Sequence, residues 1–194
     1  GELWGFPTES ILVSLVEKDY YISTGKIIYV KMIVDSRDHR VLGAQIIGEG
    51  EVDKAVNTLV TLISFQGTVE DITSMDYASS PIFAESTDPI LVAANVMFNK
   101  FSHGVKGISS LEFHKRLKEE EFVILDVREK NEAQEGQITG SLHFPLYELE
   151  GRVVELPKDK PIVIVSNTGR KAYLAYRLLK KNGFDDIAVL EGGL

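Results

Sequence analysis

Residues 166–171, Ser-Asn-Thr-Gly-Arg-Lys, form a short polar segment with the composition of an anion-binding loop. An apolar run rich in β-branched residues, 161–165, precedes this segment, and residues 172–181 that follow it repeat apolar side chains at helical spacing. The pattern predicts a strand, a tight loop and a helix. Such a loop points several backbone N–H groups at one place, where the helix dipole adds positive potential. An anion, a thiolate or a persulfide suits that place.

Ser166 is the candidate nucleophile of the loop, although its hydroxyl has neither the acidity nor the soft nucleophilicity of a thiol. The adjacent motif supplies no His that could act as its base. We therefore expect Ser166 to be inactive. Two alternatives stay open: a stand-alone enzyme that uses Ser166 on a phosphorylated or acylated compound, and an anion-binding module. The anion-binding residues would be Asn167, Thr168, Gly169, Arg170 and Lys171.

Asp126, Arg128 and Glu132 form a second polar cluster at the end of the strand that is predicted over 122–127. They could be catalytic acids with a cationic partner, or a polar network that pins the end of a strand. We favour the structural network, because buried charges need partners.

The composition excludes several classes of function. The chain has no cysteine, so disulfides, thiolate metal sites and Cys catalysis are not expected within it. Its four histidines are scattered without metal-ligand spacing, and we expect no metal. A net charge of −8 argues against nucleic-acid binding. The apolar runs are too short for a membrane span and no signal segment opens the chain, so we expect a soluble, cytoplasmic protein.

The first half of the chain predicts an α+β unit. Residues 27–34 and 41–47 are extended apolar runs that flank a polar, Asp-rich turn, which indicates a β-hairpin. Apolar residues at three- and four-residue steps predict a helix over 51–65. A second helix is expected from Pro89 to about Lys100, because proline suits a first helical turn.

The second half predicts an α/β unit, since short strands alternate with helices as they do in parallel sheets covered on both faces. Residues 99–107 contain two glycines and few apolar side chains, which indicates a domain boundary. We thus expect domains at 1–100 and 108–194 with a linker at 101–107.

Linked motifs in the second half resemble those of a rhodanese domain, in order and spacing. They are Asp-Val-Arg-Glu at 126–129, Glu132, Gly-Gln-Ile-Thr-Gly-Ser at 136–141, Pro145 and Leu-Glu-Gly-Gly at 190–193. In active rhodaneses a Cys heads a loop that resembles Cys-x-x-Gly-x-Arg and carries sulfur as a persulfide. Here Ser166 stands at the Cys position, Gly169 at the Gly and Lys171 at the Arg. The resemblance therefore implies the fold without sulfur transfer by the persulfide route.

The first hundred residues are similar to the dimerisation domain of flavin- and pyridine-nucleotide-dependent disulfide reductases. The similarity rests on Tyr20-Tyr21, the run Val-Lys-Met-Ile-Val-Asp at 30–35, the motif Val-Leu-Gly-Ala-Gln-Ile-Ile-Gly at 41–48 and Val-Asp-Lys at 52–54. In that family, coenzyme A disulfide reductases and NADH oxidase-like relatives include members with a fused rhodanese domain.

This second resemblance implies a homodimer and upstream domains that bind FAD and NAD(P)H, with coenzyme A or another thiol or persulfide compound as substrate. No Gly-x-Gly-x-x-Gly loop occurs, so no cofactor is expected in this chain. The resemblance also implies that Tyr77, in the partly matching segment 77–81, contacts the active site of a partner subunit. The chain itself would serve assembly and docking.

Overall fold

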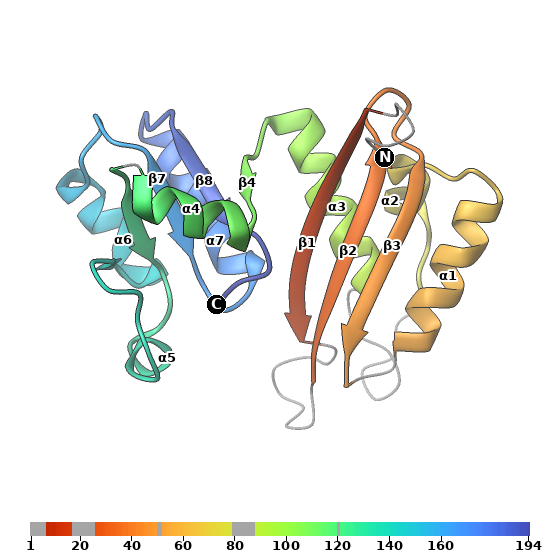
Figure 1. Cartoon of the computed structure of the whole chain (residues 1–194), viewed down its shortest axis with the longest axis horizontal. Coiled ribbons are helices and arrows are strands. Elements are labelled where there is room, and N and C mark those ends of the chain that lie inside the picture. Colours follow the sequence, from red (N-terminus) through yellow and green to blue (C-terminus); the bar gives the residue numbers. More distant parts are fainter. Residues whose placement is uncertain (1–6, 17–25, 50–51, 79–87, 120) are drawn as a thin grey trace. The chain divides into compact units, whose positions relative to one another are not determined.

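The computed structural model describes residues 7–16, 26–49, 52–78, 88–119 and 121–194. The chain divides into two compact units, Gly1–Gly104 and Val105–Leu194, whose elements are labelled in Figure 1. Tyr20, Tyr21 and the expected first residue of the 51–65 helix lie outside the described residues.

The first unit contains an antiparallel sheet in the order β1-β2-β3. Its strands are β1 (Thr8–Val16), β2 (Ile27–Asp35) and β3 (Val41–Gly48). The expected hairpin is confirmed: Tyr29 pairs with Ile47, and a register shift occurs between Ile33 and Val34. In β2, Ile28, Val30 and Met32 alternate with exposed residues and enter the core.

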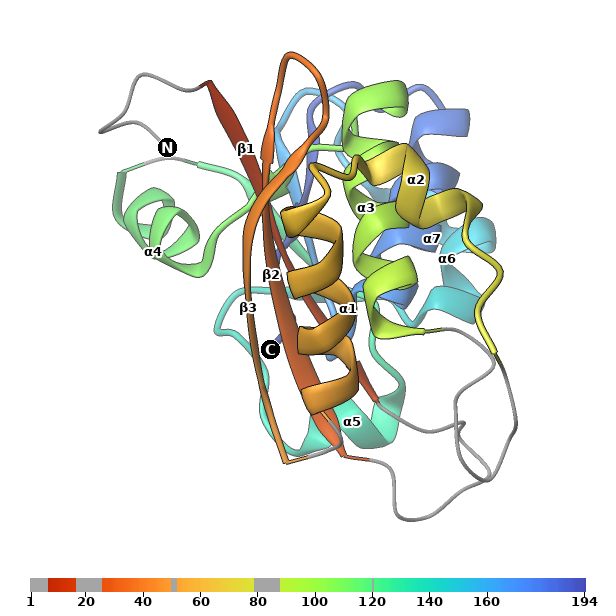
Figure 2. The ribbon, with the colours of Figure 1, turned by 90° about the vertical axis from the view of Figure 1, so that its right-hand side faces the viewer.

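Three helices cover one face of this sheet, as Figure 2 shows. They are α1 (Val52–Ser64), α2 (Val69–Ser74) and α3 (Pro89–His103). Apolar side chains from α1, α2 and α3 pack against those of the strands in one core cluster. Thr68 and Asp71 form a capping box that begins α2, while Asp88 caps α3 with Pro89 in its first turn.

The end of α1 has the hydrogen bonds of a Schellman motif, in which Gly67 N–H donates to Leu62 O at 2.8 Å and Gln66 N–H donates to Ile63 O at 3.1 Å. Gln66 occupies the left-handed position of the motif with φ 56°. At the end of α3 the corresponding residue is Gly104, with φ 61°. A residue with a Cβ is less stable than glycine in this conformation.

The second unit contains a parallel sheet in the order β4-β8-β7-β5-β6, which confirms the expected α/β fold. Its strands are β4 (Gly107–Ile108), β5 (Val123–Asp126), β6 (Leu142–His143), β7 (Ile162–Val165) and β8 (Ile187–Leu190). The four residues of β7 are all buried, because both faces of the sheet are covered.

The helices of the second unit are α4 (Ser110–Glu119), α5 (Lys130–Gln134), α6 (Leu146–Arg152), the 3₁₀ turn η2 (Val153–Glu155) and α7 (Gly169–Lys181). Successive residues of β7 join opposite clusters: Ile162 and Ile164 pack with residues of α6 and α7, while Val163 and Val165 pack with Phe113 of α4. The sheet therefore separates two apolar cores.

The structure differs from the sequence expectations in several places. Strands β1 and β4 and helices α2, α5 and α6 had not been predicted. The expected linker at 101–107 is also partly helical, because α3 continues to His103 and ends at Gly104 in the left-handed conformation. Gly107 already belongs to β4.

Across the part of the chain that the structure describes, no helix has both the length and the apolar character to span a membrane.

We predict that Gln66→Gly raises the free energy of unfolding by roughly 0.5–1 kcal/mol, since glycine relieves the left-handed backbone and loses part of that gain to unfolded-state entropy. The mirror substitution Gly104→Gln should lower it by a similar amount, because a Cβ at Gly104 meets nothing within 4 Å and only the backbone conformation is penalised. Urea unfolding of both variants would measure the two differences. A destabilised Gln66→Gly variant would contradict this account.

Candidate functional site

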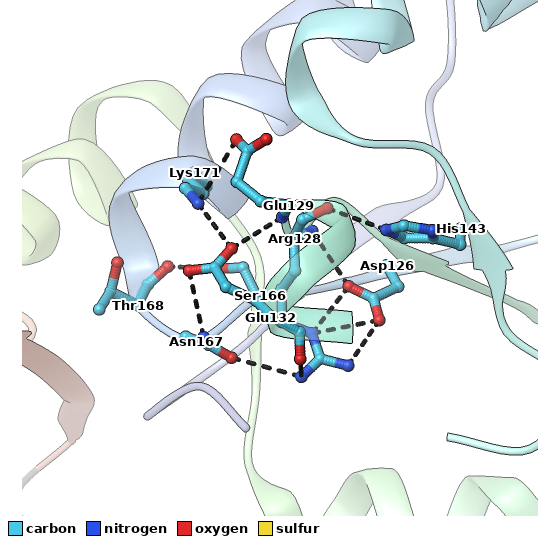
Figure 3. Close-up of polar contacts among 9 residues, drawn as sticks. All are labelled: Asp126, Arg128, Glu129, Glu132, His143, Ser166, Asn167, Thr168 and Lys171. Carbon is cyan, nitrogen blue, oxygen red and sulfur yellow. Dashed lines mark hydrogen bonds and ion pairs between the residues drawn. The ribbon is translucent and has the colours of Figure 1, made fainter. Parts of the chain in front are cut away.

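Ser166 directly follows β7 and is 2% exposed at the head of the predicted loop. Its hydroxyl donates a hydrogen bond to the carbonyl of Thr168, the N-cap residue of α7 (Figure 3). Among the described residues, no carboxylate or imidazole hydrogen-bonds to this hydroxyl. Within these residues the Ser166 oxygen therefore has no general base, and the hydroxyl proton is held in the hydrogen bond to the Thr168 carbonyl.

Asp126 and Arg128 form a buried ion pair at the end of β5. The Asp126 carboxylate accepts hydrogen bonds from Arg128 Nη2 at 2.8 Å and Nε at 3.0 Å, while Arg128 Nη2 also donates to the Gly136 carbonyl at 2.6 Å. The hydrogen bonds with Asp126 raise the pKa of the Arg128 guanidinium above its ordinary value. Arg128 thus stays charged, and through Asp126 and Gly136 it ties the strand end to the segment after α5.

Glu132 connects this pair to the loop. Its carboxylate accepts hydrogen bonds from Lys171 Nζ and from the Glu129 N–H, both at 2.7 Å, and from Asn167 Nδ2 at 3.2 Å. Burial acts to raise the pKa of Glu132, but the hydrogen bonds from Lys171 and Glu129 outweigh it, and the pKa lies below its ordinary value. Arg128 Nη1 approaches Asn167 Oδ1 at 3.4 Å. A continuous polar network therefore runs from β5 to α7 (Figure 3).

The two cations of the loop, Arg170 and Lys171, lie in different surroundings. Lys171 forms ion pairs with Glu132 at 2.7 Å and Glu129 at 3.6 Å. Arg170 is exposed in the first turn of α7 and makes no ion pair with any described side chain. No acidic residue occupies that turn, so Arg170 adds to the positive end of the helix dipole. The charge of Lys171, by contrast, is neutralised by ion pairs with the carboxylates of Glu129 and Glu132.

Contacts from outside the loop fix its backbone. The Leu194 N–H donates to the Ser166 carbonyl at 3.0 Å. Gly193, with φ 77°, lies so close to the Asn167 carbonyl that a Cβ would overlap it. On the far side of the network, His143 Nε2 contacts the Arg128 carbonyl at 2.9 Å. His143 thus supports the strand end and does not reach Ser166.

Tyr77 belongs to the first unit, where it packs against the core and its hydroxyl contacts Met75 Sδ at 3.5 Å. Burial, with the nearby Asp88 carboxylate, raises the pKa of the Tyr77 phenol to about 12. The phenol is therefore protonated at neutral pH. Residues 79–81 of its motif lie outside the described residues.

Sequence reasoning missed Glu129 as a member of this site. Glu129 lies three residues before Glu132, and this spacing at the start of a short helix is the signal that could have identified it. Within the described ranges, no three His, Asp or Glu side chains are grouped as metal ligands.

Each of the two units matches the model of a known protein family. The model of the rhodanese-like domain matches residues 109–194, and that of the pyridine nucleotide-disulphide oxidoreductase dimerisation domain matches residues 12–89. A sulfurtransferase of Allochromatium vinosum is 33% identical over 91 residues, which are 46% of this chain and 85% of that protein. The chain therefore belongs to the rhodanese-like family.

Its rhodanese-like domain follows the dimerisation domain in the same order as in two solved structures. A NAD-dependent persulfide reductase from A. fulgidus is 33% identical, with a TM-score of 0.89 over 99% of this chain. The reduced Bacillus anthracis CoADR-RHD is 28% identical, with a TM-score of 0.90 over 99% of this chain. The chain spans 34% of the length of each of these two proteins.

We predict that Arg128→Met lowers the free energy of unfolding by about 3–5 kcal/mol, because it leaves the fully buried Asp126 carboxylate without its cation. Lys160→Met, which removes an exposed ion pair with Glu121 at 3.0 Å, should cost less than about 1 kcal/mol. Chemical denaturation of the two variants would measure both values. Equal losses of unfolding free energy in the two variants would contradict this account, because the buried ion pair would then contribute no more than the exposed one.

We predict that Glu132→Gln destabilises the rhodanese-like domain by roughly 1–2 kcal/mol at neutral pH, since a neutral amide replaces a carboxylate that accepts charge-assisted hydrogen bonds. The folded-state pKa of Glu132 lies below the ordinary value of 4.5, so its contribution to stability is fully present above that pH and is lost as the pH falls through the folded-state pKa. The stability gap between wild type and variant should therefore narrow in acid. Unfolding measured across pH would test this, and a gap that widens below pH 4.5 would contradict it.

Proposed function

We propose that this chain is the C-terminal portion of an FAD- and NAD(P)H-dependent disulfide or persulfide reductase, in which it serves assembly and substrate docking rather than catalysis. Support comes from the matched persulfide reductase, described as NAD-dependent, whose similarity covers 99% of this chain with both units in the same order. The upstream domains would bind FAD and the nicotinamide, and the protein would act in the cytoplasm as a homodimer.

The environment of Ser166 is the main support for the proposed non-catalytic role. It is 2% exposed, its hydroxyl donates to the Thr168 carbonyl, and the chain has no cysteine that could replace it. Persulfide chemistry needs a thiolate, and a serine hydroxyl without a base does not provide an equivalent nucleophile. The rhodanese-like domain is therefore a degenerate sulfurtransferase that keeps the loop and its polar network.

Docking would use the parts of the loop that remain available to a partner molecule. Arg170 and the N–H groups at the start of α7 would meet the anionic or sulfur-bearing group of coenzyme A or of another thiol or persulfide compound. Lys171 holds Glu129 and Glu132 and would shape the loop rather than bind the ligand. Tyr77, with its protonated phenol, would contact the substrate in the active site of the partner subunit.

The decisive experiment restores the missing sulfur. We expect the wild-type chain to transfer no sulfane sulfur from thiosulfate or polysulfide. Ser166→Cys should gain persulfide formation, because a thiol at a helix N-terminus ionises readily in a loop that is already shaped. Sulfur-transfer assays and intact-mass spectrometry would detect transfer and persulfide, respectively.

Ser166→Ala is the matched control and should behave as the wild type in every assay. Transfer of sulfane sulfur by the wild-type chain without an added thiol would contradict the proposal. Turnover of phosphatase or esterase substrates that Ser166→Ala abolishes would instead support a stand-alone enzyme.

A further inference from the structure

Four charged side chains lie at the loop between β7 and α7, and their charges cancel. Lys171 Nζ lies 2.7 Å from the Glu132 carboxylate and 3.6 Å from that of Glu129, and Figure 3 shows the ammonium between the two. One ammonium and two carboxylates leave one negative charge, which the guanidinium of Arg170 offsets. The positive potential that remains is that of the N-terminus of α7, equivalent to about half an elementary charge.

The two carboxylates differ in how firmly they are held. The Glu132 carboxylate accepts hydrogen bonds from Lys171, Asn167 and the Glu129 N–H, and its side chain is 26% exposed. The Glu129 carboxylate approaches Lys171 only to 3.6 Å, and its side chain is 40% exposed. Glu132 therefore supports the loop, whereas Glu129 places a negative charge beside the loop where solvent reaches it.

The neighbouring cations do not offset the charge of Glu129. Lys130, the next residue, forms an ion pair with Glu148 at 2.9 Å. Arg128 is buried against Asp126, so this pair adds no net charge. An anion that approaches the loop from solvent therefore meets repulsion from Glu129 as well as the attraction of the helix end.

The charge of a ligand decides whether such a loop can compensate for the water that the ligand loses. The Coulomb attraction between a site and an anion rises in proportion to the charge of the anion. The cost of taking the anion out of water rises with the square of that charge. A loop whose side-chain charges cancel can therefore hold a neutral or singly charged group, whereas a dianion loses more in water than it regains at the loop.

We propose that Glu129 sets the charge selectivity of the loop by lowering its affinity for dianions. The group that docks at residues 166–171 is then a thiol or persulfide with no charge or one negative charge, and inorganic dianions such as thiosulfate bind weakly. This inference rests on the docking role in the proposed function and names the charge class of the ligand.

Glu129→Gln in the full chain tests this assignment, because it removes one negative charge and keeps the length of the side chain. The probes are thiosulfate, a dianion, and thiocyanate, a monoanion, titrated at constant ionic strength while the amide NMR signals of residues 167–171 are followed. The dissociation constant of thiosulfate should fall by roughly fivefold and that of thiocyanate by roughly twofold, because the Coulomb energy scales with the charge of the ligand.

Glu121→Gln is the matched control, because it makes the same change of charge at the other end of the sheet. Glu121 precedes β5, whereas the loop follows β7, which pairs with β5 in parallel. The four residues of β5 span roughly 13 Å, and charges are screened over about 8 Å at physiological ionic strength. Both dissociation constants should therefore match those of the wild type.

Equal changes for the two anions in Glu129→Gln, or no change for either, would overturn the inference and leave the docking role of the loop standing. A wild-type chain that binds thiosulfate more tightly than thiocyanate would also overturn it. Sulfur transfer by the wild type would instead contradict the proposed non-catalytic role alone, because the titrations measure binding and not turnover.

Discussion

Arg128 lies buried against Asp126, and the loop between β7 and α7 depends on how its remaining donors are used. A guanidinium has five N–H groups, and a carboxylate two residues away satisfies only part of them. The remainder contact the carbonyls of Glu132 and Gly136 and the side chain of Asn167. The cost of leaving any donor unpaired in this low-dielectric setting fixes α5, the segment after it and the loop in one arrangement.

This arrangement holds the loop of the rhodanese-like domain in shape without help from the Ser166 side chain. The network passes from Arg128 through Asn167 and Glu132 to Lys171, and none of its bonds involves the side chain of Ser166. A change of the side chain at position 166 would therefore alter the reactivity of the loop while its supports remain. Reactivity and shape are set by different residues here, as is common where function resides in a site carried by a shared fold.

The sequence predicted the elements whose burial is uniform or strictly periodic. Strands β5 and β7 are short apolar runs because helices cover both faces of their sheet. Helix α2 has only six residues, too few for a periodic pattern, and its capping box was the one local signal. At the site, the cluster of charges could be predicted from spacing. The pairing of Lys171 with Glu132 could not, because it requires α5 and α7 to meet in space.

The conformation of the loop also depends on Gly193, which lies outside the loop. Gly169 begins α7 directly after the loop, and a Cβ there would meet nothing within 4 Å, whereas a Cβ at Gly193 would overlap the carbonyl of Asn167. A larger side chain is thus sterically easier to add at Gly169 than at Gly193, although Gly193 lies beyond β8 and far from the loop in sequence. A methyl group added at position 193 would displace the two carbonyls after β7, and so alter the shape of the loop while every loop residue kept its identity.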